Sequence, residues 1–474
     1  MEFHVSLSGR KDLSGEIYRQ LRRAIVDGRL RPGDLLPPTR ELSRSLAVSR
    51  TTITVAYDRL AGESFVTSRV GAGTFVSEHV GRTPRESARQ GEGVLRPRAI
   101  WDAIPLSDAF ASRAEFDFRT GLPDASLFPH KTWRRLVARE LRAEAVAAGT
   151  YGHPAGHRGL RAAIARHIGI SRGMAVSADD VTVTSGTQQA LDVVSRVLLA
   201  PNDLVAVEDP GYPPPRRLLE SLGARIVGVP VDGDGLVVQA LPPRARVVYV
   251  TPSHQYPLGV PMTLPRRLAL LAWAEQHKAA IVEDDYDSEF RFRGRPIEPV
   301  QTLDTAGRVI YVGSFSKTLL PTLRLGFVVT PPSLRAAVHK AKFVTDWHTS
   351  LLVQAALARF MDEGGFARHL RRMAAIYRAR HEVVTQALLT EFAEHLELVP
   401  SRAGLHVAAL ARTHSVEQLG AVVRMASEAA VAVQQLARFA VQPPGRAGLV
   451  LGYGAIPTGR IAEGLRRLRQ CFEA

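Results

Sequence analysis

The first 80 residues carry hydrophobic positions at helical spacing. Over Glu16–Arg29 the apolar side chains of Ile17, Leu21 and Ile25 recur on one stripe, with Ser14 as a possible N-cap. A second, short helix is predicted over Thr39–Leu46. A third follows Ser49, and its inward positions at i, i+3, i+4 and i+7 are Ile53, Ala56, Tyr57 and Leu60. Two β-like runs in Ser64–Ser77, around Gly71-Ala72-Gly73, predict a hairpin that closes this unit.

The central part of the chain alternates short β-rich runs with longer helical patterns. Helices are predicted over Gln188–Leu199, Arg266–Gln276 and, in the Arg- and Ala-rich C-terminal part, Gly365–Leu388. This alternation is typical of an α/β fold with a mostly parallel sheet covered by helices, here followed by a small α+β portion. The predicted strands are Val181–Thr184, Leu204–Glu208, Val247–Thr251, Ala280–Glu283, Val309–Gly313 and Leu325–Thr330.

Residues 80–113 separate the two patterns. They mix Arg, Pro, Gly and Ser without helical or strand periodicity, as a linker does. We therefore expect an N-terminal unit over 1–79, a linker over 80–113 and a large domain over 114–474. A length of 474 residues also exceeds what one core usually organises.

Composition narrows the class of protein. The only cysteine, Cys471, has no partner in the chain, and we find neither a signal peptide nor a membrane-spanning run, so we expect a cytoplasmic protein. A formal net charge of +15 favours polyanionic partners. Residues 1–100 hold 17 Arg and Lys against 11 Asp and Glu, which makes this part the denser basic region.

Basic and polar residues lie outward at the start of the third helix. Arg50, Thr51 and Thr52 follow Ser49 there, where the helix dipole and free N–H groups favour phosphate, and Arg69 lies beside the hairpin tip. The string LPPTRELSRSLAVSRTTITVAYDRLAGESFVTSRVGAGTFV resembles the winged helix-turn-helix of the GntR family of bacterial regulators. The resemblance implies binding to double-stranded operator DNA, with the DNA-binding residues Arg40, Ser49, Arg50, Thr51, Thr52, Arg69 and Gly71.

A lysine follows the predicted strand Val309–Gly313 in the sequence Gly313-Ser-Phe-Ser-Lys317. Its amine can form a Schiff base with an aldehyde, and nearby hydroxyls together with Arg324 can hold a phosphate. Taken alone, this motif is weak.

An acidic cluster, Val282-Glu-Asp-Asp-Tyr286, ends another predicted strand, at the sheet edge where α/β proteins place ligands. An aspartate there can pair with a protonated pyridine nitrogen. We assign this role to Asp284, with Glu283 and Asp285 as near alternatives, and expect Tyr286 to donate to a ring phenolate.

Two further elements fit the same ligand. Ser185-Gly186-Thr187 links the strand Val181–Thr184 to a helix, so its N–H groups and the Thr187 hydroxyl form a phosphate cradle. Tyr212, at the end of Glu208-Asp-Pro-Gly-Tyr212, can stack on a planar ring.

The order of these motifs resembles the fold-type I pyridoxal 5'-phosphate (PLP) enzymes of the aminotransferase class. With the GntR-type winged helix, and with VEDPGY, TPSHQYPLG, VEDDYDSEFR and SFSKTLLPTLRLGF, the whole chain resembles the MocR family of regulators. That resemblance implies PLP as cofactor, no metal and a head-to-tail homodimer. It makes Lys317 the Schiff-base lysine and surrounds PLP with Asp284, Tyr286, Tyr212, Ser185, Gly186, Thr187, Ser314, Ser316, Arg324 and, from the other subunit, Tyr151.

Two positions depart from the aminotransferase pattern. Tyr256-Pro-Leu-Gly259 stands where Asn-Pro-Thr-Gly is common, so a contact to the phenolate is missing or replaced. Val450 stands where an arginine usually grips the substrate α-carboxylate, although Arg446 could serve instead. The effector expected from these departures is PLP itself or an amine without an α-carboxylate, such as a sulfonate or an ω-amino compound.

The sequence thus predicts a PLP-dependent transcriptional regulator that senses PLP or an amine. Two alternatives remain: a working aminotransferase with an accessory DNA-binding module, and a DNA-binding protein whose large domain is only a dimerisation scaffold. Enzymatic turnover stays open at this point.

Overall fold

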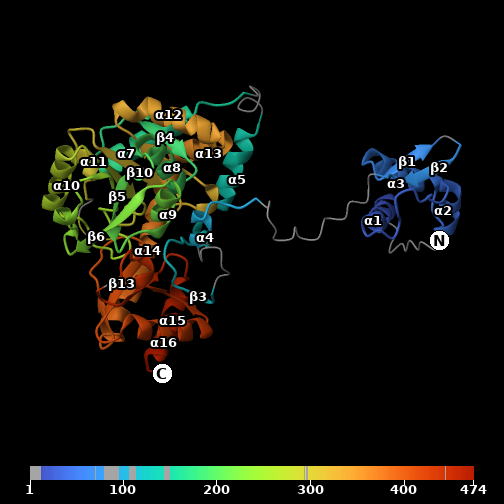
Figure 1. Ribbon diagram of the computed structural model, residues 1–474. Coiled ribbons are helices and arrows are strands. Elements are labelled where there is room, and N and C mark those ends of the chain that lie inside the picture. Colours follow the sequence, from blue (N-terminus) through green and yellow to red (C-terminus); the bar gives the residue numbers. More distant parts are fainter. Residues whose placement is uncertain are drawn as a thin grey trace. The chain divides into compact units, whose positions relative to one another are not determined.

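The computed structural model describes residues 12–69, 71–78, 95–105, 114–142, 150–292, 294, 297–443 and 445–473. The chain divides into two units, residues 1–98 and residues 99–474 (Figure 1). Most of the expected linker over 80–113 lies outside the described residues. Its described part contains a short helix, α4 (Ile100–Ala103), where no helical pattern was predicted.

The described residues of the smaller unit form three helices and a two-stranded hairpin. They are α1 (Leu13–Val26), α2 (Thr39–Ser45), α3 (Arg50–Gly62), β1 (Val66–Arg69) and β2 (Gly73–Val76). The inward positions predicted on α1 and α3 are all buried in one core. The predicted cap of α1 was wrong: Asp12, rather than Ser14, is the N-cap, and its carboxylate accepts a hydrogen bond from the Gly15 N–H. The N-cap of α3 is Ser49, whose hydroxyl accepts from the Thr52 N–H.

The larger unit is built on an eight-stranded sheet with the order β4-β11-β10-β9-β8-β5-β6-β7. The four neighbouring pairs from β10 to β6 are parallel, while β11 is antiparallel to both β10 and β4. Strands β4, β5, β8, β9 and β10 therefore point the same way. Their bounds are β4 Val181–Thr184, β5 Leu204–Asp209, β6 Arg225–Asp232, β7 Gly235–Leu236, β8 Ala245–Val250, β9 Ala280–Asp285, β10 Val309–Ser314 and β11 Gly326–Val329.

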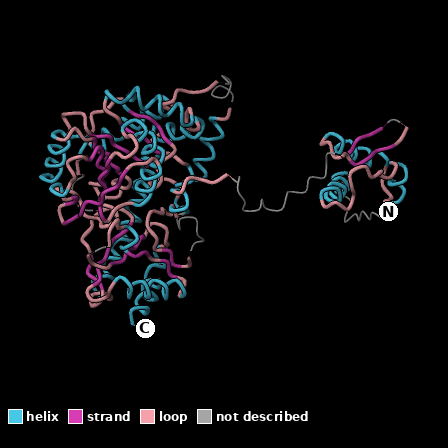
Figure 2. Tube along the Cα trace, viewed as in Figure 1, coloured by secondary structure: helices cyan, strands magenta, loops and turns pink. Residues whose placement is uncertain are grey.

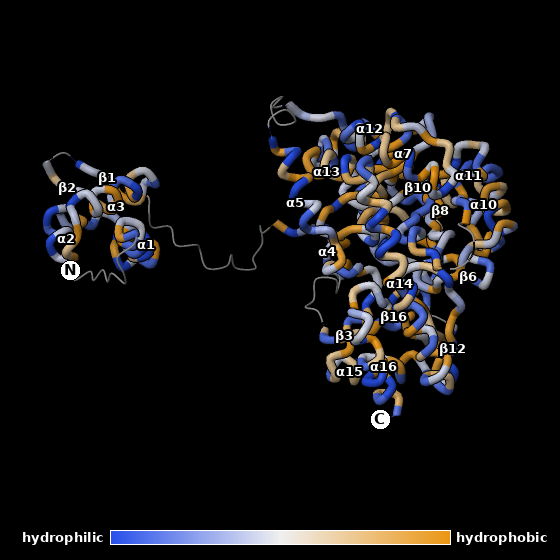
Figure 3. Tube along the Cα trace, turned by 180° about the vertical axis from the view of Figure 1, so that it is seen from behind, coloured by the Kyte–Doolittle hydropathy of each residue, from blue (hydrophilic) through white to orange (hydrophobic). Residues whose placement is uncertain are grey.

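Helices cover both faces of this sheet (Figure 2). Alternate residues of each strand point to opposite faces, and in β10 both sets are buried. One face packs against α8 (Thr187–Leu198), α9 (Pro213–Ser221) and α12 (Pro332–Asp346). The other packs against α5 (His130–Glu140), α7 (Arg158–Arg172) and α13 (Leu351–Asp362) at one end, and α10 (Leu264–Gln276) and α11 (Val300–Leu303) at the other. Burial on both faces explains the nearly continuous apolar runs of these strands (Figure 3).

A smaller C-terminal layer has its own core. A four-stranded sheet with the order β12-β13-β16-β15 packs against α14 (Gly365–Thr390), α15 (Val416–Glu428) and α16 (Thr458–Glu473). Its strands are β12 Leu396–Leu398, β13 His406–Ala411, β15 Gln434–Gln435 and β16 Gly448–Gly452; β3 (Phe116–Asp117) pairs separately with β14 (Val431–Ala432). Within the described part of the chain, no helix has the length and apolar character that crossing a bilayer requires.

The prediction missed β6 and β7. Gly228 and Pro230 interrupt the apolar run of β6, and such residues argue against a central strand. They are tolerated because this strand lies next to the end of the sheet, where its outer neighbour β7 is only two residues long.

Candidate functional site

The predicted cofactor motifs meet at one edge of the large sheet. Because β4, β5, β8, β9 and β10 run parallel, the segments that follow them emerge at the same edge. The fold thereby brings together the turn after β4, Tyr212 after β5, Tyr256 after β8, Asp284 at the end of β9 and Lys317 after β10.

Lys317 lies between β10 and the short 3-10 helix Pro321–Leu323. Its Nζ donates to the carbonyl oxygen of Gly121 at 2.6 Å. Desolvation lowers the pKa of the Lys317 amine, against the opposing effect of the carboxylates of Asp287 and Asp284. A lowered pKa increases the share of neutral amine, which is the form that attacks an aldehyde.

The three adjacent acids of β9 have different surroundings. Glu283 accepts the N–H groups of Val300 and Gln301, each at 3.0 Å. Asp285 is paired with Arg172 at 2.6 Å and accepts the Tyr311 hydroxyl. Both acids are thus held by the protein's own groups.

Asp284 differs from its two neighbours. Its Oδ2 accepts the Tyr249 hydroxyl at 2.7 Å, but its Oδ1 is buried and has no hydrogen-bond partner within the described residues. Burial raises the pKa of Asp284 to about 7. A buried carboxylate oxygen without a partner is costly, and a protonated ring nitrogen would satisfy it. The geometry therefore favours Asp284 over Glu283 and Asp285 as the ring partner.

The turn after β4 leaves an anion-binding position open. Gly186 is the N-cap of α8 with φ +82°, and no side chain among the described residues caps that helix. The Arg324 guanidinium donates to the Ser185 carbonyl at 2.5 Å, and a Cβ at position 186 would lie 2.8 Å from one of its nitrogens. An exposed guanidinium beside free helical N–H groups suits a phosphate. The residues present thus fit both the ring nitrogen of PLP, at Asp284, and its phosphate, at Arg324 and the start of α8.

The remaining predicted residues differ in their surroundings. The Ser314 hydroxyl accepts the Ser316 N–H at 3.1 Å, on the loop that carries Lys317. Tyr212 is half-buried, and its ring lies edge-on to that of Tyr256 at a centroid distance of 5.0 Å. The Tyr151 side chain is 75% exposed and packs on Trp347, and this exposure is consistent with a role toward another subunit.

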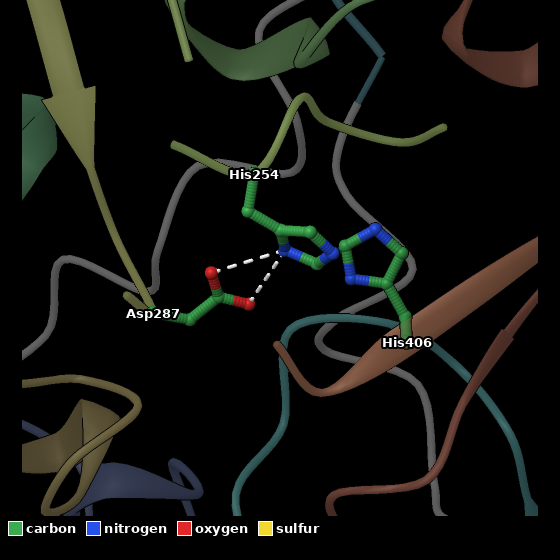
Figure 4. Close-up of side chains that lie close together, drawn as sticks. All are labelled: His254, Asp287 and His406. Atoms are coloured by element: carbon green, nitrogen blue, oxygen red, sulfur yellow. Dashed lines mark hydrogen bonds and ion pairs between the residues drawn. The ribbon is translucent and has the colours of Figure 1, made fainter. Parts of the chain in front are cut away.

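Tyr286 is hydrogen-bonded to a buried cluster that the sequence did not reveal. Figure 4 shows the three side chains of this cluster, His254, Asp287 and His406. The Tyr286 hydroxyl donates to the His254 carbonyl at 2.8 Å, and His254 Nδ1 pairs with Asp287 at 3.1 Å. His254, Asp287 and His406 hold atoms within 4.8 Å that could ligate a metal ion. However, a Cβ on neighbouring Gly404 would come within 2.0 Å of the His254 ring, so the cluster is tightly packed. It supports Tyr286 through hydrogen bonds.

Sequence reasoning also missed Gly121, Tyr249 and Glu208. Glu208 is fully buried, and desolvation raises its pKa to about 7; its Oε2 accepts from Thr251 and Gln255. The sequence predicted that the strand of Glu208 is buried, but it gave no sign of a role for this carboxylate. Gly121 gives no signal, because its role depends on a hydrogen bond to a residue 196 positions away.

The two expected departures are clear in the structure. Val450 is fully buried in β16 and packs in an apolar cluster with Tyr256, Leu436 and Phe439. Arg446, the alternative carboxylate ligand, instead pairs with Glu397 at 2.8 Å, with both side chains about half exposed. Arg446 therefore does not replace the missing arginine at the site. The Tyr256 hydroxyl lies 2.5 Å from Thr120 Oγ1.

The predicted DNA-facing residues lie on the surface of the smaller unit. Arg40, Arg50 and Arg69 are exposed and form no ion pair within the described residues. Arg50 Nε donates to the Thr39 hydroxyl at 3.3 Å, and the Arg69 guanidinium lies 5.3 Å from the Phe75 ring centroid. Thr51 is exposed and Thr52 half-buried on α3, while Gly71 is exposed in the β1–β2 turn with φ +79°.

Comparisons with known proteins agree with both units. Residues 13–76 match the family described as bacterial regulatory proteins, gntR family, and residues 123–450 match aminotransferase class I and II. The probable rhizopine catabolism regulatory protein MocR of Rhizobium meliloti is 40% identical over 97% of this chain and 93% of its own length. The pyridoxine biosynthesis transcriptional regulator PdxR of Corynebacterium glutamicum is 33% identical, covering 83% and 82% of the two chains. The kynurenine aminotransferase of Pyrococcus horikoshii, solved with PMP, superposes with a TM-score of 0.72 at 27% identity, over 79% of this chain and 96% of that one.

The fold and site define a winged helix-turn-helix regulator joined to a fold-type I aminotransferase domain. The chain belongs to the family of MocR-type transcriptional regulators. It is a DNA-binding regulator whose larger domain has the architecture of PLP-dependent enzymes.

Proposed function

We propose that this regulator acts in the cytoplasm, holds PLP on Lys317 and changes its operator binding when PLP or an amine occupies the site. The observation that carries the proposal is the buried Oδ1 of Asp284, which has no hydrogen-bond partner in the described part of the chain, beside a lysine of lowered pKa. PLP, when bound, supplies an aldehyde that links covalently to primary amines and a ring that withdraws electrons.

Each residue has a proposed task. When PLP is bound, its aldehyde would link to the Lys317 amine with loss of one water, and Asp284, positioned by the Tyr249 hydroxyl, would hold a proton at the ring nitrogen. Tyr212 would stack on the ring. The Tyr286 hydroxyl, which donates to the His254 carbonyl here, would turn to donate to the phenolate of bound PLP. The phosphate is bound by the set Ser185, Gly186, Thr187, Ser314, Ser316 and Arg324.

Regulation requires two conformational states of different ligand affinity, because an effector shifts an equilibrium only by its differential binding. We propose that the states differ in how the winged helices meet DNA. Arg40, Ser49, Arg50, Thr51, Thr52, Arg69 and Gly71 form the proposed DNA-facing set. Ser49 also caps α3, so its hydroxyl is partly engaged.

A homodimer is the proposed assembly, head-to-tail as in the family. An exposed aromatic and aliphatic patch supports it: Val344 and Tyr151 are each 75% exposed, and Trp347 and Phe343 lie beside them. Patches of this kind mark interfaces. Val344→Glu should shift the protein toward monomer in sedimentation measurements. In the monomer, Tyr151 would no longer contact the PLP phosphate bound by the other subunit.

The test of the cofactor proposal is the visible absorbance spectrum of the protein mixed with PLP. A band that is present in the native chain and absent in Lys317→Ala supports covalent binding at this lysine. If neither protein shows a band, the larger domain does not bind PLP covalently, and its role as a dimerisation scaffold is favoured.

A second candidate, a working aminotransferase, is favoured by the lowered pKa of Lys317 and opposed by the apolar surroundings of Val450. Turnover with a panel of amino donors and oxo acids separates the two. Sustained turnover at ordinary enzyme rates, about 1 per second or more, would overturn a purely regulatory role.

A further inference from the structure

A neutral amide lies beside the group that holds the reactive lysine. Gln434 Oε1 accepts both the Thr120 N–H at 3.0 Å and the Thr120 hydroxyl at 2.9 Å. A backbone N–H only donates, so this atom is the amide oxygen. The next residue, Gly121, accepts from Lys317 Nζ at 2.6 Å. Within the described residues, the Gln434 amide nitrogen makes no hydrogen bond.

The surroundings of this amide are hydroxylic and apolar. Thr120 Oγ1 also contacts the Tyr256 hydroxyl at 2.5 Å. Gln434 lies directly opposite Val450 in the β15–β16 pair, and Val450 packs with Tyr256 and Phe439. We call this set the neutral wall: Thr120, Tyr256, Gln434, Phe439 and Val450. Thr120 and Gln434 are half-buried, and the other three are buried.

Three arginines on segments next to the neutral wall are engaged in ion pairs or exposed. Arg119 forms a two-point pair with Asp117, at 2.9 and 2.7 Å, and Arg446 pairs with Glu397. Arg438 is exposed, although close enough for its charge to act on Tyr256. An acid group on the neutral wall would lose its hydration without gaining a buried cation in return.

We propose that the effector is a primary amine whose remainder bears hydroxyl groups and no acid group, and that the Gln434 amide selects it. The inference rests on the proposed function, because the amine replaces Lys317 at the aldehyde carbon. One C–N linkage forms there and one breaks; Lys317 leaves as the free amine, and no water or electrons are gained or lost. The effector's hydroxyl oxygen then accepts from the Gln434 NH2 group.

The experiment titrates the full-length, PLP-loaded protein with matched pairs of amines. The pairs are 2-amino-1,3-propanediol against serine, 4-amino-1-butanol against 4-aminobutyrate, and ethanolamine against taurine. The change in the visible band gives each Kd. In every pair we expect the alcohol to bind at least tenfold more tightly than the acid.

Three variants sharpen the result. Gln434→Leu should weaken binding of the alcohols about tenfold, because it removes the donor. Gln435→Leu is the matched control: its amide nitrogen donates to Val416 O at 2.9 Å, away from the wall, and alcohol binding should stay as in the native protein. Val450→Arg should invert the preference toward the acids by supplying the missing cation.

Some outcomes would overturn the inference while leaving the proposed function intact. The first is a cofactor band together with tighter binding of the acids than of the alcohols; loss of this acid binding in Arg438→Ala would assign it to that arginine. The second is equal alcohol binding by the Gln434→Leu and Gln435→Leu proteins. The band recorded before any amine is added reports the proposed function separately. If no band forms in the native protein, both proposals fail.

Discussion

The cofactor site and the DNA-facing surface of this regulator differ in the exposure of their charged side chains. At the sheet edge, Asp284 is 3% exposed and positioned by the Tyr249 hydroxyl. On the winged helix, Arg50 is exposed and makes one long hydrogen bond to Thr39. A buried, positioned charge fits one ligand geometry, whereas an exposed arginine on a flexible stem adjusts to the DNA that it meets.

The difference predicts unequal consequences of mutation. A buried charge whose partner is removed loses far more interaction energy than an exposed one, because water cannot compensate it. Changes at the sheet edge should therefore have the larger effects and act on cofactor binding. Changes on the winged helix should be smaller and depend on salt.

The largest expected effect is that of Lys317→Ala, which removes the amine that bonds to PLP. We expect complete loss of the visible band and of any effector response, while operator binding without effector persists. Spectra and gel-shift titrations check this. Lys278→Ala, on the turn after α10, is a control that should keep the band. If the Lys317→Ala protein kept the band, Lys317 would not be the residue that bonds covalently to PLP.

Asp284→Asn should weaken PLP binding on the order of 100-fold, because it removes the charge that pairs with the ring nitrogen. Equilibrium titration of the cofactor-free protein measures this. Tyr249→Phe removes only the hydroxyl that positions Asp284 and should cost about tenfold. An unchanged affinity of the Asn variant would show that another acid, or none, faces the ring.

The same residue gives a pH test. Burial raises the pKa of Asp284 from 3.8 to about 7, so the folded protein binds its proton more tightly than the unfolded chain. Stability of the cofactor-free protein is therefore lost as pH rises from about 4 to about 7. Asp284→Asn should relieve this loss, raising the Tm more at pH 8 than at pH 5. A gain independent of pH would contradict the raised pKa.

Arg50→Ala should weaken operator binding by about 1–3 kcal/mol if the guanidinium reads a base edge. Fluorescence anisotropy with the operator and with an unrelated duplex measures the effect. Arg23→Ala is the control, since Arg23 lies on α1 and pairs with Asp27. Equal weakening on both duplexes would assign Arg50 to the phosphates.

The smallest expected effect is that of Arg69→Ala on the wing. Its guanidinium lies over the Phe75 ring and should touch the DNA backbone. We expect a few-fold loss of affinity and a reduction of about 1 in the slope of log affinity against log salt. A salt dependence equal to that of the native protein would place Arg69 away from the phosphates.

Six predicted strands correspond to β4, β5, β8, β9, β10 and β11; the bounds of β4 agree with the prediction, and the ends of the others differ by at most two residues. These strands were visible because burial on both faces produces apolar runs with clear ends. The three helices of the winged helix were visible through their 3.6-residue period. Strand β6 was missed because Gly228 and Pro230 interrupt its pattern.

The sequence by itself determined the two-unit organisation, the family and the chemical groups available for PLP, because these depend on local pattern and on motifs of adjacent residues. The tertiary structure alone singled out Asp284 among three neighbouring acids, since of the three it alone has a buried oxygen that no described residue hydrogen-bonds. It also separated Arg446 from the site and joined Gln434 to Thr120 across 314 positions. Such contacts depend on how distant segments pack, and no local pattern encodes them.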